Sequence, residues 1–176
     1  MALTMRLDTR EVDRRLSILR APQVALMRAL NRTAATVKTT MVREVAQDLG
    51  VPVGTVRPLI NVVRATETQL AAEVRASAAR LPLSAMGGVR GPLPSRGRGT
   101  VTVRGRRYPD AFRARMSSGH VGVFTRTGRR RLPITELRTA SVAHVFTKHL
   151  PAGIDRWREQ LGKHLEHEID FLMSRG

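Results

Sequence analysis

The chain has 176 residues and a formal charge of +17, with 41% hydrophobic residues, 3% aromatic residues and no cysteine. Its length suits one domain with an aliphatic core, and the lack of cysteine excludes a disulfide framework and a thiolate metal site, as expected of a protein made in a reducing cytoplasm. Because it has no run of about 18 apolar residues and no signal-like N-terminal segment, we expect neither a membrane span nor secretion.

The first 50 residues are expected to be helical. Asp8 and Glu11 have the spacing of a capping box, and the apolar residues after them predict a short helix that ends near Ala21. A second helix is predicted from Pro22 to a stop at Gly50, with a length of about 42 Å at roughly 1.5 Å per residue. Its apolar stripe consists of Leu30, Ala34, Val37, Met41, Val45 and Leu49.

Residues 51–137 are expected to form strands and basic loops. Alternating or β-branched residues predict strands over 60–63, 72–76, 100–104, 120–126 and 132–136, the last either extending the sheet or crossing its edge. The segment Leu81–Arg98 is rich in Gly, Pro, Ser and Arg and is predicted to be a loop, and Gly105–Arg107 is predicted to be a basic turn.

The C-terminal part, residues 138–176, is expected to be helical again. Ser141 is the predicted cap of a helix that ends near His149, and Pro151 is predicted to open a separate last helix. The apolar face of that last helix is Ile154, Trp157, Leu161, Leu165, Ile169 and Leu172. The whole pattern predicts a single α+β domain over 1–176, in which the helices of 1–50 and 138–176 pack on a small, mainly antiparallel sheet with a basic Gly/Arg-rich loop.

The positive charge is concentrated in the middle of the chain. Residues 74–135 contain fourteen arginines and one acid, Asp110, and therefore carry +13 of the +17. The planar guanidinium favours bidentate contact with phosphate or carboxylate, so the expected partner is DNA, RNA or an acidic protein surface. The alternative is a solvated face that only keeps the protein soluble.

Residues 45–60 suggest a different function. Val45, Gly50 and the apolar residues around them have helix-turn-helix spacing, which suggests a DNA-binding regulator. Pro58 falls where the recognition helix should continue, at a cost of roughly 3 kcal/mol, and Arg57 has no suitable neighbour for reading base edges. The opposing interpretation is a helix that ends at Leu49, a glycine turn and one short helical turn before a strand.

The histidines do not predict a catalytic or metal site. His164 and His167, near Glu166 and Glu168, share a helix face only roughly, and a salt-bridged surface explains them equally well. We expect His120 to be buried or bonded to the backbone rather than to act as a base. Because the chain also lacks a P-loop ending and the carboxylate cluster of a nuclease, we expect no enzymatic activity, no metal and no cofactor.

Four blocks of sequence, in a fixed order, carry a resemblance to a known family. They are Tyr108-Pro109-x-Ala111-Phe112, Ser118-Gly119-His120-x-Gly122-Val123-Phe124, Arg131-Leu132-Pro133-Ile134-x-Glu136-Leu137 and Ser141-Val142. A looser likeness upstream includes Ala29–Ala34 and Leu83–Ala85, so it covers most of the chain. With these blocks the chain resembles the minor tail protein Z family of lambda-like phages and prophages.

The resemblance implies a structural protein of the virion tail, located at the head-proximal end of a siphophage tail and assembled in the host cytoplasm. It implies action late in tail assembly, where the protein completes the tail for head joining and receives the DNA end. The implied partners are the tail terminator, the tail tube, the tape measure protein, the head-tail connector and genomic DNA, and the expected assembly is a homo-hexameric ring. No catalytic residues are implied.

Two sets of site residues are predicted. The set for contact with DNA or an acidic partner is Arg96, Arg98, Arg104, Arg106, Arg107, Arg126, Arg129, Arg130 and Arg131. The structural set within the family-like blocks is Tyr108, Pro109, Phe112, Gly119, His120, Gly122, Phe124, Leu132, Pro133 and Ile134. We expect the three aromatic residues to anchor the sheet against a helix and the two glycines to permit a tight turn or a bulge.

Overall fold

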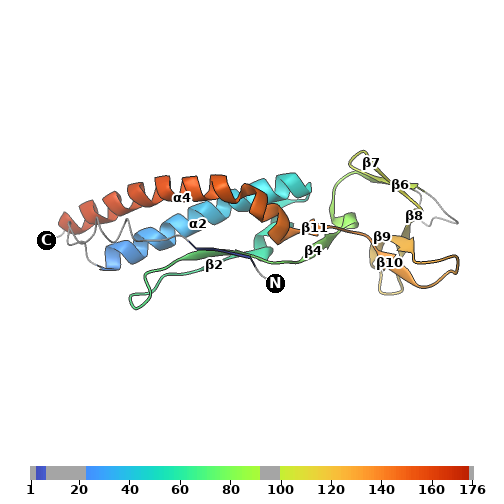
Figure 1. The fold of residues 1–176 in the computed structure, drawn as a ribbon, viewed down its shortest axis with the longest axis horizontal. Helices are drawn as coiled ribbons and strands as arrows, with labels where there is room; N and C mark the ends of the chain where they lie inside the picture. The colour runs from blue at the N-terminus through green and yellow to red at the C-terminus, as the bar shows by residue number, and fades with distance from the viewer. Residues whose placement is uncertain (1–2, 7–22, 92–99, 175–176) are drawn as a thin grey trace.

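The computed structural model of the chain describes residues 3–6, 23–91 and 100–174, and for residues 3–6, 172 and 173 it describes the backbone alone (Figure 1). The predicted first helix, Asp8–Ala21, lies outside these residues, as do Arg96 and Arg98. The described chain forms two long helices and several small antiparallel sheets, so the α+β prediction is confirmed. None of the described helices has the length and apolar character needed to span a bilayer.

The molecule is elongated and has two parts joined by a narrow ribbon (Figure 1). We call one part the helical body: α2 (Gln23–Leu49), α3 (Val53–Val56), the 3-10 helix η1 (Arg57–Leu59), α4 (Val142–Met173), β1 (Leu3–Arg6), β2 (Ile60–Val63) and β3 (Glu73–Ala76). The other part, residues 83–137, we call the β-lobe. The ribbon between them is the antiparallel pair β4 (Arg80–Pro82) and β11 (Arg138–Ser141).

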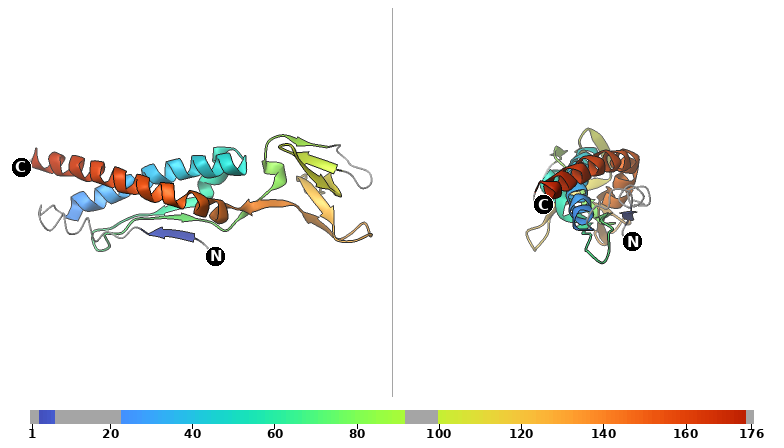
Figure 2. Two further views of the ribbon diagram at one scale, coloured as in Figure 1. Left: turned by 45° about the horizontal axis from the view of Figure 1, so that its top comes forward. Right: turned by 90° about the vertical axis from the view of Figure 1, so that its left-hand side faces the viewer.

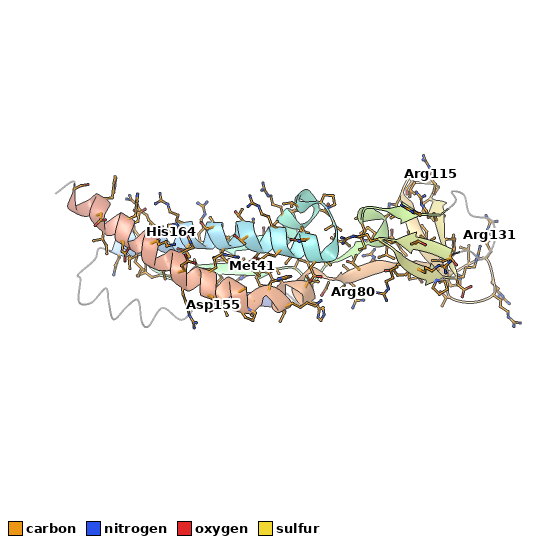
Figure 3. All side chains as sticks on the ribbon, turned by 90° about the horizontal axis from the view of Figure 1, so that it is seen from above. Met41, Arg80, Arg115, Arg131, Asp155 and His164 are labelled. Atoms are coloured by element: carbon orange, nitrogen blue, oxygen red, sulfur yellow. The ribbon has the colours of Figure 1, made fainter. Side chains whose placement is uncertain are left out.

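The helical body is built around α2, whose apolar stripe packs along α4 (Figure 2). All six stripe residues predicted from the sequence are buried, and Phe146 and Trp157 of α4 are fully buried against them. Gly153 allows the helices to approach closely, because a Cβ there would lie 2.9 Å from the sulfur of Met41, which lies between the helices in Figure 3. The predicted strands β2 and β3 are confirmed, and β3 forms the centre of a sheet in the order β1-β3-β2.

The predicted break at Pro151 is wrong, because α4 continues through this residue as one helix of 32 residues. A proline inside a helix removes one backbone hydrogen bond and costs about 3 kcal/mol. Phe146 before Pro151 and Trp157 after it are both fully buried in the same core, so packing on the two sides outweighs that local cost. The predicted cap is confirmed, since the amide of His144 donates to Oγ of Ser141 at 3.2 Å.

The β-lobe consists of two three-stranded sheets with their own small core. One sheet contains β5 (Val89–Arg90), β6 (Thr100–Val103) and β7 (Arg106–Pro109), and the other contains β8 (Ala111–Arg115), β9 (Val121–Arg126) and β10 (Ile134–Glu136). Between them lie Leu83 of the 3-10 helix η2 (Leu83–Ala85), Val101, Val103, Ala111 and Val123. The body and the lobe thus enclose separate hydrophobic clusters, and the action of the whole chain as one domain stays a prediction.

Several predictions for the β-lobe need correction. Strand β8 was not predicted, and the predicted loop over 81–98 contains η2 and β5 within its described residues. The turn is at Arg104 and Gly105, whose φ angles of 50° and 82° are those of a two-residue hairpin turn, so Arg106 and Arg107 belong to β7. The strands predicted over 100–104, 120–126 and 132–136 are confirmed as β6, β9 and β10, and β10 extends the sheet beside β9.

Candidate functional site

The β-lobe carries the arginines that the sequence predicts for contact with a polyanion. Six of the seven described members are exposed, namely Arg104, Arg106, Arg107, Arg129, Arg130 and Arg131, and Arg126 is half-buried. Arg129, Arg130 and Arg131 lie in the loop between β9 and β10, and Figure 3 shows Arg131 near the free end of the lobe. These side chains do not form one uniform belt, because their surroundings differ.

Two of the arginines are held over aromatic rings. The guanidinium carbon of Arg126 lies 4.6 Å from the centroid of the Phe112 ring, and that of Arg106 lies 5.4 Å from the centroid of Tyr108. Cation–π contacts of this kind contribute about 0.5–1 kcal/mol at exposed sites. Both guanidinium groups are therefore partly ordered before any partner binds.

Arg104 lies against the helical body as well as being exposed. Its guanidinium lies over Gly50, where a Cβ would collide with it. Gly50 ends α2 with a φ of 68°, and two backbone bonds close the helix end, from Gly50 N to Gln47 O and from Val51 N to Ala46 O. Because the C-terminal end of a helix carries partial negative charge, Arg104 links the β-lobe to the body there.

Two further arginines, Arg113 and Arg115 on β8, were missed because this strand was not recognised. Together with Arg126 and Arg131 they line a groove on the β-lobe. The remaining lining residues are Phe112, Ala114, Met116, Ser117, Leu132 and Ile134, and no carboxylate is among them. We call this the lobe groove. Arg113 is fixed by a 3.0 Å hydrogen bond that it donates to the carbonyl oxygen of Gly91.

The aromatic residues of the family-like blocks pack within the β-lobe. Phe112 and Phe124 are paired across β8 and β9, with their ring centroids 6.2 Å apart, and each is 6% exposed. Tyr108 packs against the small core of the lobe. The prediction that these rings anchor the sheet against an α-helix is therefore wrong. Their contacts among the described residues are with each other, with Arg106, Arg126 and His120, and with the small core of the lobe.

The two predicted glycines have different roles. Gly119, with a φ of 84°, lies in the turn between β8 and β9, where the amide of Met116 donates to the carbonyl of His120 at 2.8 Å. Gly122 lies on β9 under the Phe124 ring, with no space for a side chain. The first glycine serves the turn, as predicted, and the second permits close packing.

His120 is neither buried nor bonded through its ring to the backbone, contrary to the prediction. Its side chain is 45% exposed, and Nε2 lies 2.7 Å from Oε1 of Glu136 on the neighbouring strand. Arg138 approaches the other oxygen of Glu136 at 3.5 Å. These contacts join the start of β9 with β10 and β11 at the base of the lobe.

The other residues of the predicted structural set lie at the edges of the lobe. Pro109 ends β7 and is exposed, and Ile134 begins β10 and is half-buried. Leu132 is 65% exposed, and the peptide bond between it and Pro133 is cis.

Two histidines near the C-terminal end of α4, His164 and His167, contact groups of the protein. Nδ1 of His164 lies 3.0 Å from Oγ1 of the buried Thr33, and burial, with a smaller effect of Arg32, lowers the pKa of His164. His167 contacts Arg32 at 3.4 Å, and Glu168 pairs with the same arginine at 3.3 Å. Within the described chain there is no group of three or more His, Asp or Glu side chains placed to hold a metal ion.

Residues 45–60 do not form a helix-turn-helix. After the glycine turn, α3 has four residues, and the 3-10 helix η1, which contains Pro58, continues directly into β2. Between Gly50 and β2 there is no helix long enough to lie in a major groove, where a recognition helix presents several side chains to base edges. The short-helical-turn interpretation is confirmed for this segment, and the regulator alternative loses its structural basis.

Comparison with known proteins gives one assignment. The family model described as prophage minor tail protein Z (GPZ) matches residues 11–175. The match covers both the helical body and the β-lobe. No curated protein and no solved structure matched the chain.

Proposed function

We propose, because this chain belongs to the family of prophage minor tail protein Z, that it completes the head-proximal end of a siphophage tail. Family membership establishes a structural role in a bacteriophage tail. The position in the tail, the joining of tail to head and the positioning of the DNA end are our proposal. It is supported by the uneven distribution of charge. The β-lobe, at one end of the elongated molecule, presents exposed arginines and has only Asp110 and Glu136 as acids among its described residues, whereas the arginines of the helical body lie among the other described acids (Figure 1).

The proposed contact with DNA or an acidic neighbour depends on the loop between β9 and β10. Arg129, Arg130 and Arg131 are exposed, and we infer that they meet either phosphate in the tail lumen or carboxylates of a neighbouring tail protein. Contact with phosphate would be independent of sequence and sensitive to salt, because it releases condensed counterions. The proposed partners are the tail terminator, the tail tube, the tape measure protein and the head-tail connector.

The proposed assembly is a homo-hexameric ring that matches the tail axis. Copies arranged around an axis would repeat the arginines of each lobe. The seven described arginines of the predicted contact set would then give about 42 positive charges in a ring of six. Size-exclusion chromatography and electron microscopy of the purified protein test for the ring. Mass spectrometry of mature particles tests for its presence in the virion, and absence from particles would refute the proposed function.

A triple substitution tests the role of the exposed arginines. Changing Arg129, Arg130 and Arg131 to Ser should leave the unfolding free energy near that of the wild type, since exposed charges contribute little to stability. If the arginines contact DNA, the slope of log K against log salt should fall by up to about 3, because each lost phosphate contact removes about 0.9. Phage titre should fall through impaired head joining.

A matched control comes from the helical body. Changing the exposed Arg43, Arg57 and Arg64 to Ser removes the same charge from another part of the molecule. This control should retain titre and most of the salt slope. If both triple variants behave alike, net charge alone matters and the β9–β10 loop has no specific role.

A further inference from the structure

The lobe groove combines positive charge with an apolar surface. Arg113, Arg115, Arg126 and Arg131 contribute to its lining, and none of its described lining residues carries a carboxylate. Leu132, one of its lining residues, is 65% exposed, and removing this apolar side chain from water on binding a partner would be favourable. Arg113 and Arg126 are already oriented, by Gly91 and by the Phe112 ring. Such a groove suits an acidic protein surface that also presents apolar or aliphatic atoms.

Two exposed acids lie near the opposite end of the same chain. Glu166 and Asp170 are exposed, lie four residues apart on α4 and have no ion pair with any described residue. We call them the acidic pair. By contrast, the buried Glu168 pairs with Arg32 at 3.3 Å, and Glu159 is bonded to Lys163 at 2.6 Å.

The acidic pair is locally unfavourable. Like charges four residues apart destabilise a helix by about 0.2–0.5 kcal/mol. Asp170 also lies in the last turn of α4, which ends at Met173, where the helix dipole disfavours negative charge. Among the described residues, therefore, no cation pairs with the acidic pair, and no carboxylate lines the lobe groove.

The two surfaces lie at opposite ends of the elongated molecule and cannot meet within one chain (Figure 1). We propose that the lobe groove of one copy binds the acidic pair at the end of α4 in a second copy. This inference rests on the ring assembly of the proposed function and supplies the contact that would build it. The contact joins two different surfaces, and such head-to-tail contacts close into rings or continue as filaments according to the rotation between copies.

Charge complementarity favours a second copy over DNA in this groove. The acids of the β-lobe are Asp110 and Glu136 among its described residues, and the other described acids lie on the helical body. The apolar rim at Leu132 and Ile134 offers nothing to a phosphate backbone but can cover the aliphatic part of a glutamate side chain. Duplex DNA remains the competing occupant in the test.

Charge reversal with rescue tests the contact. One variant carries Arg115→Glu and Arg131→Glu, a second carries Glu166→Arg and Asp170→Arg, and a third carries all four changes. Each double variant should weaken self-association, measured by light scattering and analytical ultracentrifugation, by about 100-fold or more, since opposed like charges suppress association. The four-fold variant restores opposite charges across the contact. Its self-association should therefore be at least tenfold stronger than that of either double variant.

The control reverses two acids elsewhere on the same helix. Asp155 and Glu159 are exposed, and their change to Arg alters net charge by the same amount as the second variant without touching the acidic pair. It should leave self-association within a few-fold of the wild type. Circular dichroism checks that every variant is folded.

Cross-linking adds a measurement of proximity. The chain has no cysteine, so Leu132→Cys with Ser174→Cys introduces the only two thiols, one at the groove and one a turn beyond Asp170. A short bismaleimide should give a ladder of oligomers with this pair, and much less with Leu132→Cys and Thr147→Cys.

The outcomes separate this inference from the proposed function. Rings that persist in both double-reversal variants, or a four-fold variant without recovery of self-association, would overturn the proposed contact. Duplex DNA that binds at Arg115 and Arg131 without displacing a second copy would also overturn it. A protein found in mature particles would still act in the tail in each case. Its absence from particles would refute the tail function without bearing on how purified copies associate.

Discussion

Gly122 provides the sharpest test of the packing in the β-lobe. A Cβ on its backbone would lie 2.7 Å from Cζ of Phe124 and 2.8 Å from Oε1 of Glu136, whereas unstrained carbon contacts are about 3.5–4.0 Å. Gly122→Ala must therefore displace one of these two groups. Displacing the ring disturbs the pair with Phe112, and displacing the carboxylate breaks the 2.7 Å contact with His120.

The expected loss in free energy of unfolding is about 1–3 kcal/mol, the usual cost of overpacking. The value should approach the upper end if the Phe124 ring moves, because an aromatic pair contributes about 0.5–1.5 kcal/mol. It should approach the lower end if Glu136 moves, because its ion pair with the exposed Arg138 contributes less than about 1 kcal/mol. In a protein that already carries Phe124→Leu, Gly122→Ala should lower the free energy of unfolding by less than it does in the wild type. That difference would identify the Phe124 ring as the group that obstructs the alanine side chain.

The assay must report on the lobe itself. Trp157 lies in the separate core of the helical body, so its fluorescence follows that part of the molecule. Amide hydrogen exchange on β9, combined with urea unfolding followed by circular dichroism, reports on the lobe. Gly128→Ala is the matched control, because nothing lies within 4 Å of a Cβ there. If both alanine variants differ by less than about 0.5 kcal/mol and protection on β9 is unchanged, the packing argument is wrong.

Three further predictions concern the helical body. Trp157→Ala should cost about 3–5 kcal/mol in urea unfolding, whereas Trp157→Phe should cost much less, because the buried indole N–H has no hydrogen-bond partner among the described residues. The folded-state pKa of His164 is lowered by burial, so its stabilisation is present above its unfolded pKa of about 6.5 and is lost as the pH falls through the folded value. The unfolding free energy should therefore decrease as the pH falls below about 6.5, and His164→Gln should flatten this decrease. Ser141→Ala removes the cap of α4 and should cost about 0.5–2 kcal/mol, visible as faster amide exchange at His144.

The helical body was largely predictable because its signals are local and repeated. The apolar stripe of α2 recurs over many turns, and Gly50 marks its end with a backbone conformation that favours glycine. The error at Pro151 shows the limit of a local rule, since burial of Phe146 and Trp157 in one core is a tertiary effect. No pattern within α4 alone reveals that the same core lies on both sides of the proline.

The β-lobe was harder to predict because its contacts depend on strand register. Ala111–Arg115 contains two arginines in five residues, a composition that resembles a basic loop more than a strand. Arg113 is accommodated by a carbonyl 22 residues earlier, and His120 meets Glu136 only because β9 and β10 are adjacent. The sequence contains these residues but not the pairing that brings them together.

The arginines of the β-lobe divide into structural and available groups, and this division changes how the charge should be interpreted. Arg104 covers the end of α2, Arg113 holds Gly91 and Arg126 covers Phe112, so part of the charge stabilises the lobe and its junction with the body. Arg115 and Arg131 line the lobe groove and are exposed. Substitutions in the first group should therefore lower stability and binding together, whereas substitutions in the second should lower binding alone. A uniform solvated face would show no such split, so the two responses distinguish a built interface from a merely soluble surface.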